Sequence, residues 1–246
     1  MRRFFVDPSL LRGSSGIISG ELCRHLVTVL RLAPGEKVTL ADGEGGEAVA
    51  TITAVTPEGV HVDLMPCPAV PSYAATPAIT VYQALPKGDK LDLVLQKCTE
   101  LGAAAIVPFM AERSVTRLEG ERLEKRVARW QKIAQEAARQ SGRGTVPRVG
   151  FAADLAGVLR GGSHDLCLML WEEETEQGLR GVLERADRPA SIAVIIGPEG
   201  GLTPAEAALA KGAGYLPITL GSRILRTETA GLAVVSILQY LWGDLG

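Results

Sequence analysis

The chain has 246 residues, of which 46% are hydrophobic and 22% charged, an ordinary composition for a globular protein that argues against long disordered regions. The formal net charge is −2, so the bulk charge alone gives no indication of a nucleic-acid partner. The four cysteines lie far apart in the sequence and form no CxxC pair, and we therefore expect neither a metal site nor a disulfide framework.

The N-terminus begins with basic and apolar residues, as a signal sequence does. Asp7, Pro8 and Arg12 interrupt it before an apolar stretch of ~7–15 residues develops. The longest apolar runs, such as residues 192–196, are shorter than the ~18 residues needed to span a bilayer. We therefore expect a cytoplasmic protein with no membrane partner.

Residues 1–72 are predicted to form a small β-barrel, because short alternating segments are separated by tight turns. The strands are expected at 3–6, 37–41, 47–55 and 59–65. The glycines of Asp42-Gly43-Glu44-Gly45-Gly46 supply the turn of a hairpin. One short helix is expected over 21–31, capped by Ser19, with Leu22, Leu26 and Val29 on its apolar side.

A change of composition marks the predicted domain boundary. Three prolines in the segment 66–71 favour an extended linker, so we expect domains at 1–72 and 73–246. From Ile79 onward, predicted strands alternate with predicted helices, which is typical of an α/β domain with a mostly parallel sheet. The expected strands cover 79–85, 104–109, 166–171, 191–196 and 217–220, and the expected helices cover 89–101, 119–140, 178–186, 204–211 and 229–242.

The last two predicted helices carry distinctive signals. Thr203, Pro204 and Glu206 predict an N-cap, a first helical residue and a capping box, and Gly212 is expected just past the end of that helix. The closing helix is apolar on nearly every side, so it must be covered on more than one side.

The regional charge differs strongly from the bulk value. Residues 1–72 carry 6 basic and 8 acidic residues, residues 73–150 carry 13 and 8, and residues 151–246 carry 7 and 12, which gives −2, +5 and −5. The basic stripe between 122 and 148 is either a solvated helix face or a surface that contacts RNA phosphates. The candidate RNA-binding residues are Arg2, Arg3, Arg12, Arg24, His25, Arg31, Lys87, Arg139 and Arg143.

Two loops each connect a predicted strand to a predicted helix and carry the strongest functional signal. The first is Gly197-Pro198-Glu199-Gly200-Gly201, and its spacing matches neither a dinucleotide-binding motif nor a P-loop. The second is Leu220-Gly221-Ser222-Arg223-Ile224-Leu225-Arg226-Thr227-Glu228-Thr229-Ala230. Glycines after a strand let backbone N–H groups approach a small ligand closely.

This pair of loops resembles the signature of the SPOUT methyltransferases, and specifically of the RsmE family, which methylates N3 of a uridine in small-subunit ribosomal RNA. Segments 25–31, 85–90 and 97–102 are also similar to that family, so the resemblance covers almost the whole chain. It implies a PUA-like barrel, a knotted α/β domain that binds S-adenosylmethionine, and a homodimer formed through the knotted domain. The implied partner is 16S ribosomal RNA, on the assembled small subunit.

The resemblance also implies roles for individual residues. The cofactor pocket would be formed by Leu170, Glu172, Ile196, Gly197, Gly200, Gly201, Leu220, Ile224, Leu225 and Thr227. Glu173, Glu174 and Glu176 crowd around Glu172, so the acid that contacts the cofactor is left open.

Arg226 and Glu199 are the candidate catalytic residues. Arg226 would hold a phosphate or a developing oxyanion of the target, and its alternative role is a salt bridge with Glu228 or Glu199. Glu199 would accept a proton or contact the cofactor, or would only complement the following helix N-terminus. An alternative function for the whole chain is an RNA-binding ribosome assembly factor with a vestigial cofactor pocket.

Overall fold

The computed structural model describes residues 1–67 and 76–245, so most of the predicted linker lies outside the described residues. The chain forms two compact units, one made of 1–72 with 138–146, and the other of 73–137 with 147–246. The segment 138–146 therefore groups with the first unit, although it lies far beyond the predicted domain boundary at residue 72. Within that unit, the Val146 N–H donates to the Gly43 carbonyl over 2.9 Å.

The first unit contains a five-stranded sheet in the order β1-β3-β4-β5-β2, in which only the β1–β3 pair is parallel. Its strands are β1 Arg3–Phe5, β2 Ser15–Ile18, β3 Lys37–Ala41, β4 Glu47–Thr56 and β5 Gly59–Pro66. A short 3-10 helix, η1, covers Pro8–Arg12. The predicted hairpin joins β3 to β4, and Gly43 adopts a φ of 80° there. Phe4, Leu26 and Leu40 are part of the core.

The predicted helix over 21–31 is partly wrong. Helix α1 covers Gly20–Arg24 and continues as a π-helical turn, η2, over His25–Val29. Ser19 occupies the N-cap position without a side-chain hydrogen bond, because Gly20 follows it with a φ of 69° and no regular first turn forms. The wider π turn rotates Val29 away from Leu26, so Val29 is 65% exposed rather than part of the apolar side.

The second unit contains a six-stranded, wholly parallel sheet in the order β11-β9-β10-β6-β7-β8, as the alternation of strands and helices predicts. Its strands are β6 Ala78–Ala84, β7 Ala105–Phe109, β8 Arg148–Val149, β9 Leu166–Leu170, β10 Ser191–Ile196 and β11 Leu216–Ile218. Its helices are α2 Lys90–Glu100, α3 Gly120–Ser141, α4 Leu155–Leu159, α5 Leu179–Leu183, α6 Pro204–Gly212 and α7 Thr227–Trp242.

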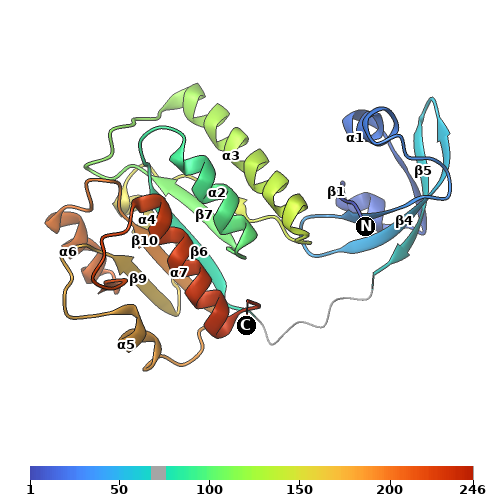
Figure 1. Ribbon diagram of the computed structural model, residues 1–246. Coiled ribbons are helices and arrows are strands. Elements are labelled where there is room, and N and C mark those ends of the chain that lie inside the picture. The colour runs from blue at the N-terminus through green and yellow to red at the C-terminus, as the bar shows by residue number, and fades with distance from the viewer. Residues whose placement is uncertain (68–75, 246) are drawn as a thin grey trace. The chain divides into compact units, whose positions relative to one another are not determined.

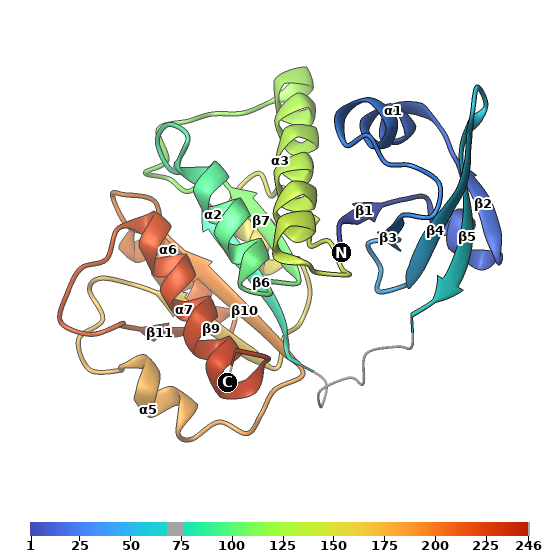
Figure 2. The same cartoon turned by 45° about the vertical axis from the view of Figure 1, so that its right-hand side comes forward.

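Helices cover both faces of the parallel sheet (Figures 1 and 2). Ile79 and Val81 of β6 pack in one core with α2, α3, α5 and α7, whereas Tyr82 and Ala84 pack in another with α4 and α6. Successive residues of a strand point to opposite faces, so a central strand buried on both sides is apolar at almost every position. This arrangement is a three-layer α/β/α fold.

The two ends of α6 are set by local signals, with one error in the prediction. Thr203 and Glu206 form the expected reciprocal capping box at the start of α6. Gly212 still belongs to α6, and Gly214, with a φ of 89°, is the residue that reverses the chain. Within the described part of the chain, no helix combines the length and the apolar character that a membrane span needs.

Candidate functional site

A cavity of about 1000 Å³ lies at the carboxyl ends of β9, β10 and β11. Because the strands are parallel, the loops that leave them meet at one edge of the sheet, where open α/β sheets usually bind ligands. Leu170 ends β9, Ile196 ends β10 and Ile218 ends β11, and all three line this cavity. Both glycine loops singled out in the sequence therefore border the same space.

The first glycine loop is shaped by close approaches that exclude a side chain. Gly201 has a φ of 68°, and a Cβ atom there would overlap the carboxylate of Glu172. A Cβ atom at Gly197 would lie 3.1 Å from the backbone nitrogen of Leu202. The backbone of this loop is thus brought against the cavity without intervening side chains.

The second glycine loop forms the opposite wall. The Thr219 hydroxyl donates to the Gly221 carbonyl over 3.1 Å, and Gly221 adopts a φ of 112°. Leu225 packs against the core, whereas the side chain of Ile224 is 90% exposed at the rim. All ten residues expected to bind a cofactor line the cavity: Leu170, Glu172, Ile196, Gly197, Gly200, Gly201, Leu220, Ile224, Leu225 and Thr227.

Two of the four crowded glutamates, Glu172 and Glu174, line the cavity. The carboxylate of Glu174 accepts hydrogen bonds from the backbone N–H groups of Gln177 (3.0 Å) and Glu176 (2.9 Å). These bonds, that of Gln177 first, lower the pKa of Glu174 and fix its carboxylate in its own loop. Glu172 is therefore the better candidate for a ligand contact.

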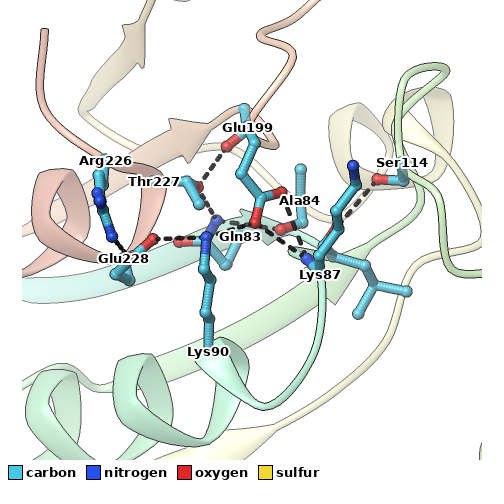
Figure 3. A network of polar contacts seen from close by, with 11 residues as sticks. Gln83, Ala84, Lys87, Lys90, Ser114, Glu199, Arg226, Thr227 and Glu228 are labelled. Atoms are coloured by element: carbon cyan, nitrogen blue, oxygen red, sulfur yellow. Dashed lines mark hydrogen bonds and ion pairs between the residues drawn. The ribbon is translucent and has the colours of Figure 1, made fainter.

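A polar network lies beside the cavity and joins three segments that are distant in sequence (Figure 3). Lys90 Nζ is 2.8 Å from Glu199 Oε1 and 3.6 Å from Glu228 Oε2, and the Lys87 N–H donates to Glu199 over 3.1 Å. Burial alone would raise the pKa of Glu199, but the hydrogen bonds from Lys90 and the backbone bring it below its usual value. The hydrogen bond to Glu199 raises the pKa of Lys90. Glu199 is therefore held as a carboxylate.

Arg226 is far more accessible than Lys90. Its side chain is 81% exposed, lines the cavity, and has one nitrogen 4.0 Å from Glu228 Oε1, too far for a hydrogen bond. Glu199, the other alternative partner, is bound by Lys90 instead. Most of the guanidinium is therefore available to a ligand.

Sequence reasoning did not select Lys90, Glu228 or Gln83 as site residues. Lys90 belongs to the segment 85–90 quoted for the resemblance, and only its pairing across 109 positions of sequence reveals its place in the site. Gln83 donates a hydrogen bond to Thr227, 144 positions away. The sequence signal for Gln83 is a glutamine within a predicted strand that is otherwise mostly apolar.

The candidate RNA-binding residues of β1 to η2 differ in what their side chains contact. Arg2, Arg12, Arg24 and Arg31 are exposed. Arg3 forms two hydrogen bonds with the Glu47 carboxylate, of 2.6 and 3.1 Å, which favours a structural role for it. His25 is half-buried, and its ring meets that of Phe4 edge-on with centroids 6.1 Å apart.

The remaining candidates are Lys87, before α2, Arg139, in the last turn of α3, and Arg143, just after α3. Lys87 is exposed, whereas Arg139 and Arg143 are half-buried in the segment that groups with the first unit. Arg143 donates to the Thr145 hydroxyl over 3.2 Å. Within the stripe itself, Arg129 forms an ion pair with Asp92, and Lys125 with Glu121. Over the described residues 1–67 and 76–245, no cluster of three or more His, Cys, Asp or Glu side chains could hold a metal ion.

Two family profiles match the two parts of the chain. The profile described as "RNA methyltransferase PUA domain" matches residues 18–65, and the one described as "RNA methyltransferase domain" matches residues 74–239. Together they include both glycine loops and residues 18–65 of the predicted barrel.

Relatives of established name match the whole chain. The ribosomal RNA small subunit methyltransferase E of Bacillus subtilis is 36% identical, over 98% of this chain and 96% of its own, and that of Mycobacterium bovis is 33% identical, over 97% and 92%. The crystal structure of the Neisseria gonorrhoeae methyltransferase E bound to S-adenosylmethionine is 36% identical, with a TM-score of 0.85 and complete coverage of both chains. A Legionella pneumophila methyltransferase with bound S-adenosylmethionine is 32% identical, with a TM-score of 0.82 over 97% of each chain.

Proposed function

The chain belongs to the ribosomal RNA small subunit methyltransferase E family, and on that premise we propose that it transfers a methyl group from S-adenosylmethionine to N3 of a uridine in 16S ribosomal RNA. The observation that carries this proposal is that both glycine loops border the same cavity. The polar network of Lys90, Glu199 and Glu228 lies directly beside it.

The residues of the cavity fit S-adenosylmethionine. Its volume of about 1000 Å³ is ample for such a ligand, since small-molecule pockets commonly measure ~300–1,000 Å³. Leu170, Ile196 and Leu225 offer apolar surface for an adenine ring, and the close-packed glycine backbone offers N–H and C=O groups for polar atoms. Glu172 would hold the ribose hydroxyls, and the nearby carboxylates suit a ligand that carries a positive sulfonium.

In the proposed reaction, the protein aligns the uridine with the methyl group and stabilises the charges that develop. The bound cofactor supplies a methyl group already activated by its sulfonium. A bond forms from N3 to the methyl carbon, the carbon–sulfur bond breaks with its electron pair left on sulfur, and the N3 proton passes to a base. Holding N3 in line with the methyl group supplies much of the rate. Glu199, kept ionised by Lys90, is the proposed proton acceptor.

Arg226 is proposed to stabilise the negative charge that develops on the uracil oxygens as the proton leaves. N3 lies on the Watson–Crick edge of the base, so the target uridine must be unpaired when it reacts. The exposed arginines of the first unit would hold the surrounding RNA through its phosphates. Arg2, Arg12, Arg24 and Arg31 are the residues proposed for this contact.

Replacing Arg226 with alanine is expected to reduce methyl transfer at least a hundredfold, because one preorganised charge contact is lost at the reacting base. Binding of S-adenosylmethionine, measured by isothermal titration calorimetry, should change little, since the side chain is 81% exposed. Arg180→Ala removes an exposed arginine of α5 and is the control. If Arg226→Ala loses cofactor binding instead, its role is structural.

Transfer of tritium from labelled S-adenosylmethionine tests the function itself. We expect incorporation into the 16S RNA of unmethylated small subunits and less into naked RNA, because the proposed substrate is the assembled subunit. Cofactor binding without transfer to either substrate would favour the alternative, an RNA-binding assembly factor with a vestigial pocket. Action on ribosomal RNA agrees with the expected cytoplasmic location.

The proposed active form is a homodimer in which the closing helix α7 contributes to the interface. Ile237, Tyr240 and Leu241 of α7 are 42%, 71% and 48% exposed, so one side of this apolar helix is uncovered in a single chain. The knotted course of the chain around the cofactor, implied by the family resemblance, is part of the same proposal.

A further inference from the structure

Gln83 is a fully buried polar residue in the central parallel strand β6. Its neighbours Val81 and Tyr82 pack in the apolar cores on the two faces of the sheet. The Oε1 atom of Gln83 lies 3.7 Å from the position that a Cβ atom of Gly231 would take, so the side chain points toward α7. A buried amide in such surroundings requires hydrogen-bond partners.

The amide nitrogen of Gln83 has two acceptors. It donates to the Thr227 hydroxyl over 2.8 Å and to the Ala84 carbonyl over 3.0 Å. The Thr227 hydroxyl in turn donates to the Gly197 carbonyl over 2.6 Å. A hydroxyl has a single proton, which Thr227 uses on Gly197, so its oxygen must accept from Gln83. The orientation of the amide follows from this chain of bonds.

These bonds connect the three segments that define the cavity wall. Gln83 lies on β6, Gly197 begins the first glycine loop after β10, and Thr227 begins α7 directly after the second loop. Gly197 and Thr227 line the cavity, and Gln83 stands behind them. Fixing the Gly197 carbonyl restricts the orientation of the adjoining peptide groups in a loop that lines the cavity.

The oxygen atom of the same amide is buried and has no hydrogen bond within the described part of the chain to offset its loss of contact with water. No donor among the described residues reaches Gln83 Oε1, and a buried acceptor without a partner disfavours folding. A leucine of similar length would fill this position without that cost. Stability alone therefore does not explain a glutamine here.

We infer that Gln83 is a positioning residue of the cofactor site: it holds the Thr227 hydroxyl against the Gly197 carbonyl and thereby sets the geometry of both glycine loops. This inference rests on the proposed binding of S-adenosylmethionine in the cavity. Gln83 acts through Thr227 and Gly197 and does not itself contact the cofactor.

The test measures cofactor affinity and stability in the same full-length variants. Gln83→Leu is expected to weaken S-adenosylmethionine binding about tenfold by calorimetry, to raise KM for the cofactor with kcat nearly unchanged, and to leave the Tm equal to or above that of the wild type. Thr227→Val should weaken binding by a similar factor. The double variant should bind no more weakly than either single variant, because each of the three variants breaks the same chain of hydrogen bonds from Gln83 through Thr227 to Gly197. Thr227→Ser, which keeps the hydroxyl, should retain wild-type affinity.

Gln239→Leu is a matched control. Gln239 is a buried glutamine of α7 whose Oε1 also has no partner among the described residues, but its amide donates to the Gly102 carbonyl, outside the cavity wall. This variant should leave cofactor affinity unchanged.

The results separate the inference from the function on which it rests. Wild-type affinity in both Gln83→Leu and Thr227→Val, with the wild-type protein binding the cofactor, overturns the positioning role and leaves the proposed function intact. Absence of binding by the wild-type protein overturns both. If Gln83→Leu fails to fold, the stability argument is wrong, and Gln83→Met, which keeps the length of the side chain but not its donor, then decides the positioning role.

Discussion

Lys90 is the residue on which the polar network beside the cavity depends. Its ammonium contacts a carboxylate that follows β10, Glu199, and one at the start of α7, Glu228. Glu228 is only 12% exposed and its Oε2 atom makes no hydrogen bond to any described residue, so the charge of Lys90 is its main compensation. Removing Lys90 would therefore leave Glu228 without its main ion-pair partner and would raise the pKa of Glu199.

We predict that Lys90→Met shifts the acidic limb of the pH–rate profile to higher pH. The pKa of Glu199 is below its usual value in the folded protein, and its reactive carboxylate form is lost as the pH falls through that pKa. Loss of the cation raises the pKa, so protonation occurs at higher pH in the variant. The measurement is kcat/KM for methyl transfer as a function of pH.

Lys97→Met is the control for this experiment, since Lys97 pairs with Glu100 on the same helix α2 and does not line the cavity. Its profile should match that of the wild type. An acidic limb that stays in place in Lys90→Met would show that Glu199 is not the proton acceptor.

Arg31 has a backbone conformation that favours glycine. Its φ is 53°, it is the only described non-glycine residue with a positive φ, and it directly follows the π-helical turn His25–Val29 and Leu30. The left-handed conformation costs an L-residue with a Cβ atom about 1 kcal/mol. Because glycine would adopt this conformation without strain, the presence of an exposed arginine here is the reason to test its side chain.

Arg31→Gly should therefore lower the affinity for RNA and leave the stability of the fold nearly unchanged. Relief of the strained conformation offsets the added freedom of the unfolded chain, so we expect the free energy of unfolding to stay within about 1 kcal/mol of the wild type. Affinity for 16S RNA, measured by filter binding at fixed salt, should fall severalfold, as one phosphate contact is lost. Lys37→Ala removes another exposed cation of the same unit and should bind RNA normally. Unchanged RNA affinity in Arg31→Gly would contradict the assignment.

Among the elements, α7 has the clearest unpartnered surface. Ile237, Tyr240 and Leu241 are spaced three and four residues apart, so they share one side of the helix, which borders the side where Val234, Val235 and Leu238 are buried. This side is proposed to pack on a second copy of the chain.

Leu241→Asp is expected to convert a dimer into a monomer, because it would bury an unpaired charge in an apolar interface. Analytical ultracentrifugation at micromolar concentration measures this directly. Leu209→Asp, on an exposed position of α6, should remain dimeric. A wild-type protein that sediments as a monomer would contradict the proposed interface.

The elements that sequence analysis predicts well are those with complete local signals. Strand β10 and the capping box of α6 agree with the prediction at every residue, since a continuous apolar run and a Thr-Pro-x-Glu motif do not depend on distant contacts. Strands β2 and β8 and helix α4 were missed. They have at most five residues each, and such short strands form only by pairing with a neighbour that the sequence does not reveal.

The same distinction applies to the site. The two glycine loops are contiguous motifs, and the structure brings all of their selected residues to one cavity. Lys90, Glu228 and Gln83 act through contacts with residues far away in sequence, and periodicity or spacing cannot predict such contacts. The π-helical turn after α1 was also beyond prediction, because its residues have an ordinary helical pattern.

For the whole molecule, the net charge of −2 conceals a division between regions. The central region 73–150 carries +5 and the C-terminal region 151–246 carries −5. The acidic region contains both glycine loops and suits a cationic cofactor, whereas the basic residues suit an RNA backbone. The family profile for a methyltransferase domain, residues 74–239, covers both of these regions, and the profile for a PUA domain, residues 18–65, lies before them.

The central claim is that this chain methylates N3 of a uridine in 16S ribosomal RNA. The most direct test incubates the full-length protein and S-adenosylmethionine with small subunits that lack the modification, digests the 16S RNA, and identifies the methylated nucleoside by mass spectrometry. We predict one new N3-methyluridine at a single position, and its loss in Arg226→Ala. A methyl group on a base carbon or a ribose oxygen, or none at all, would contradict it.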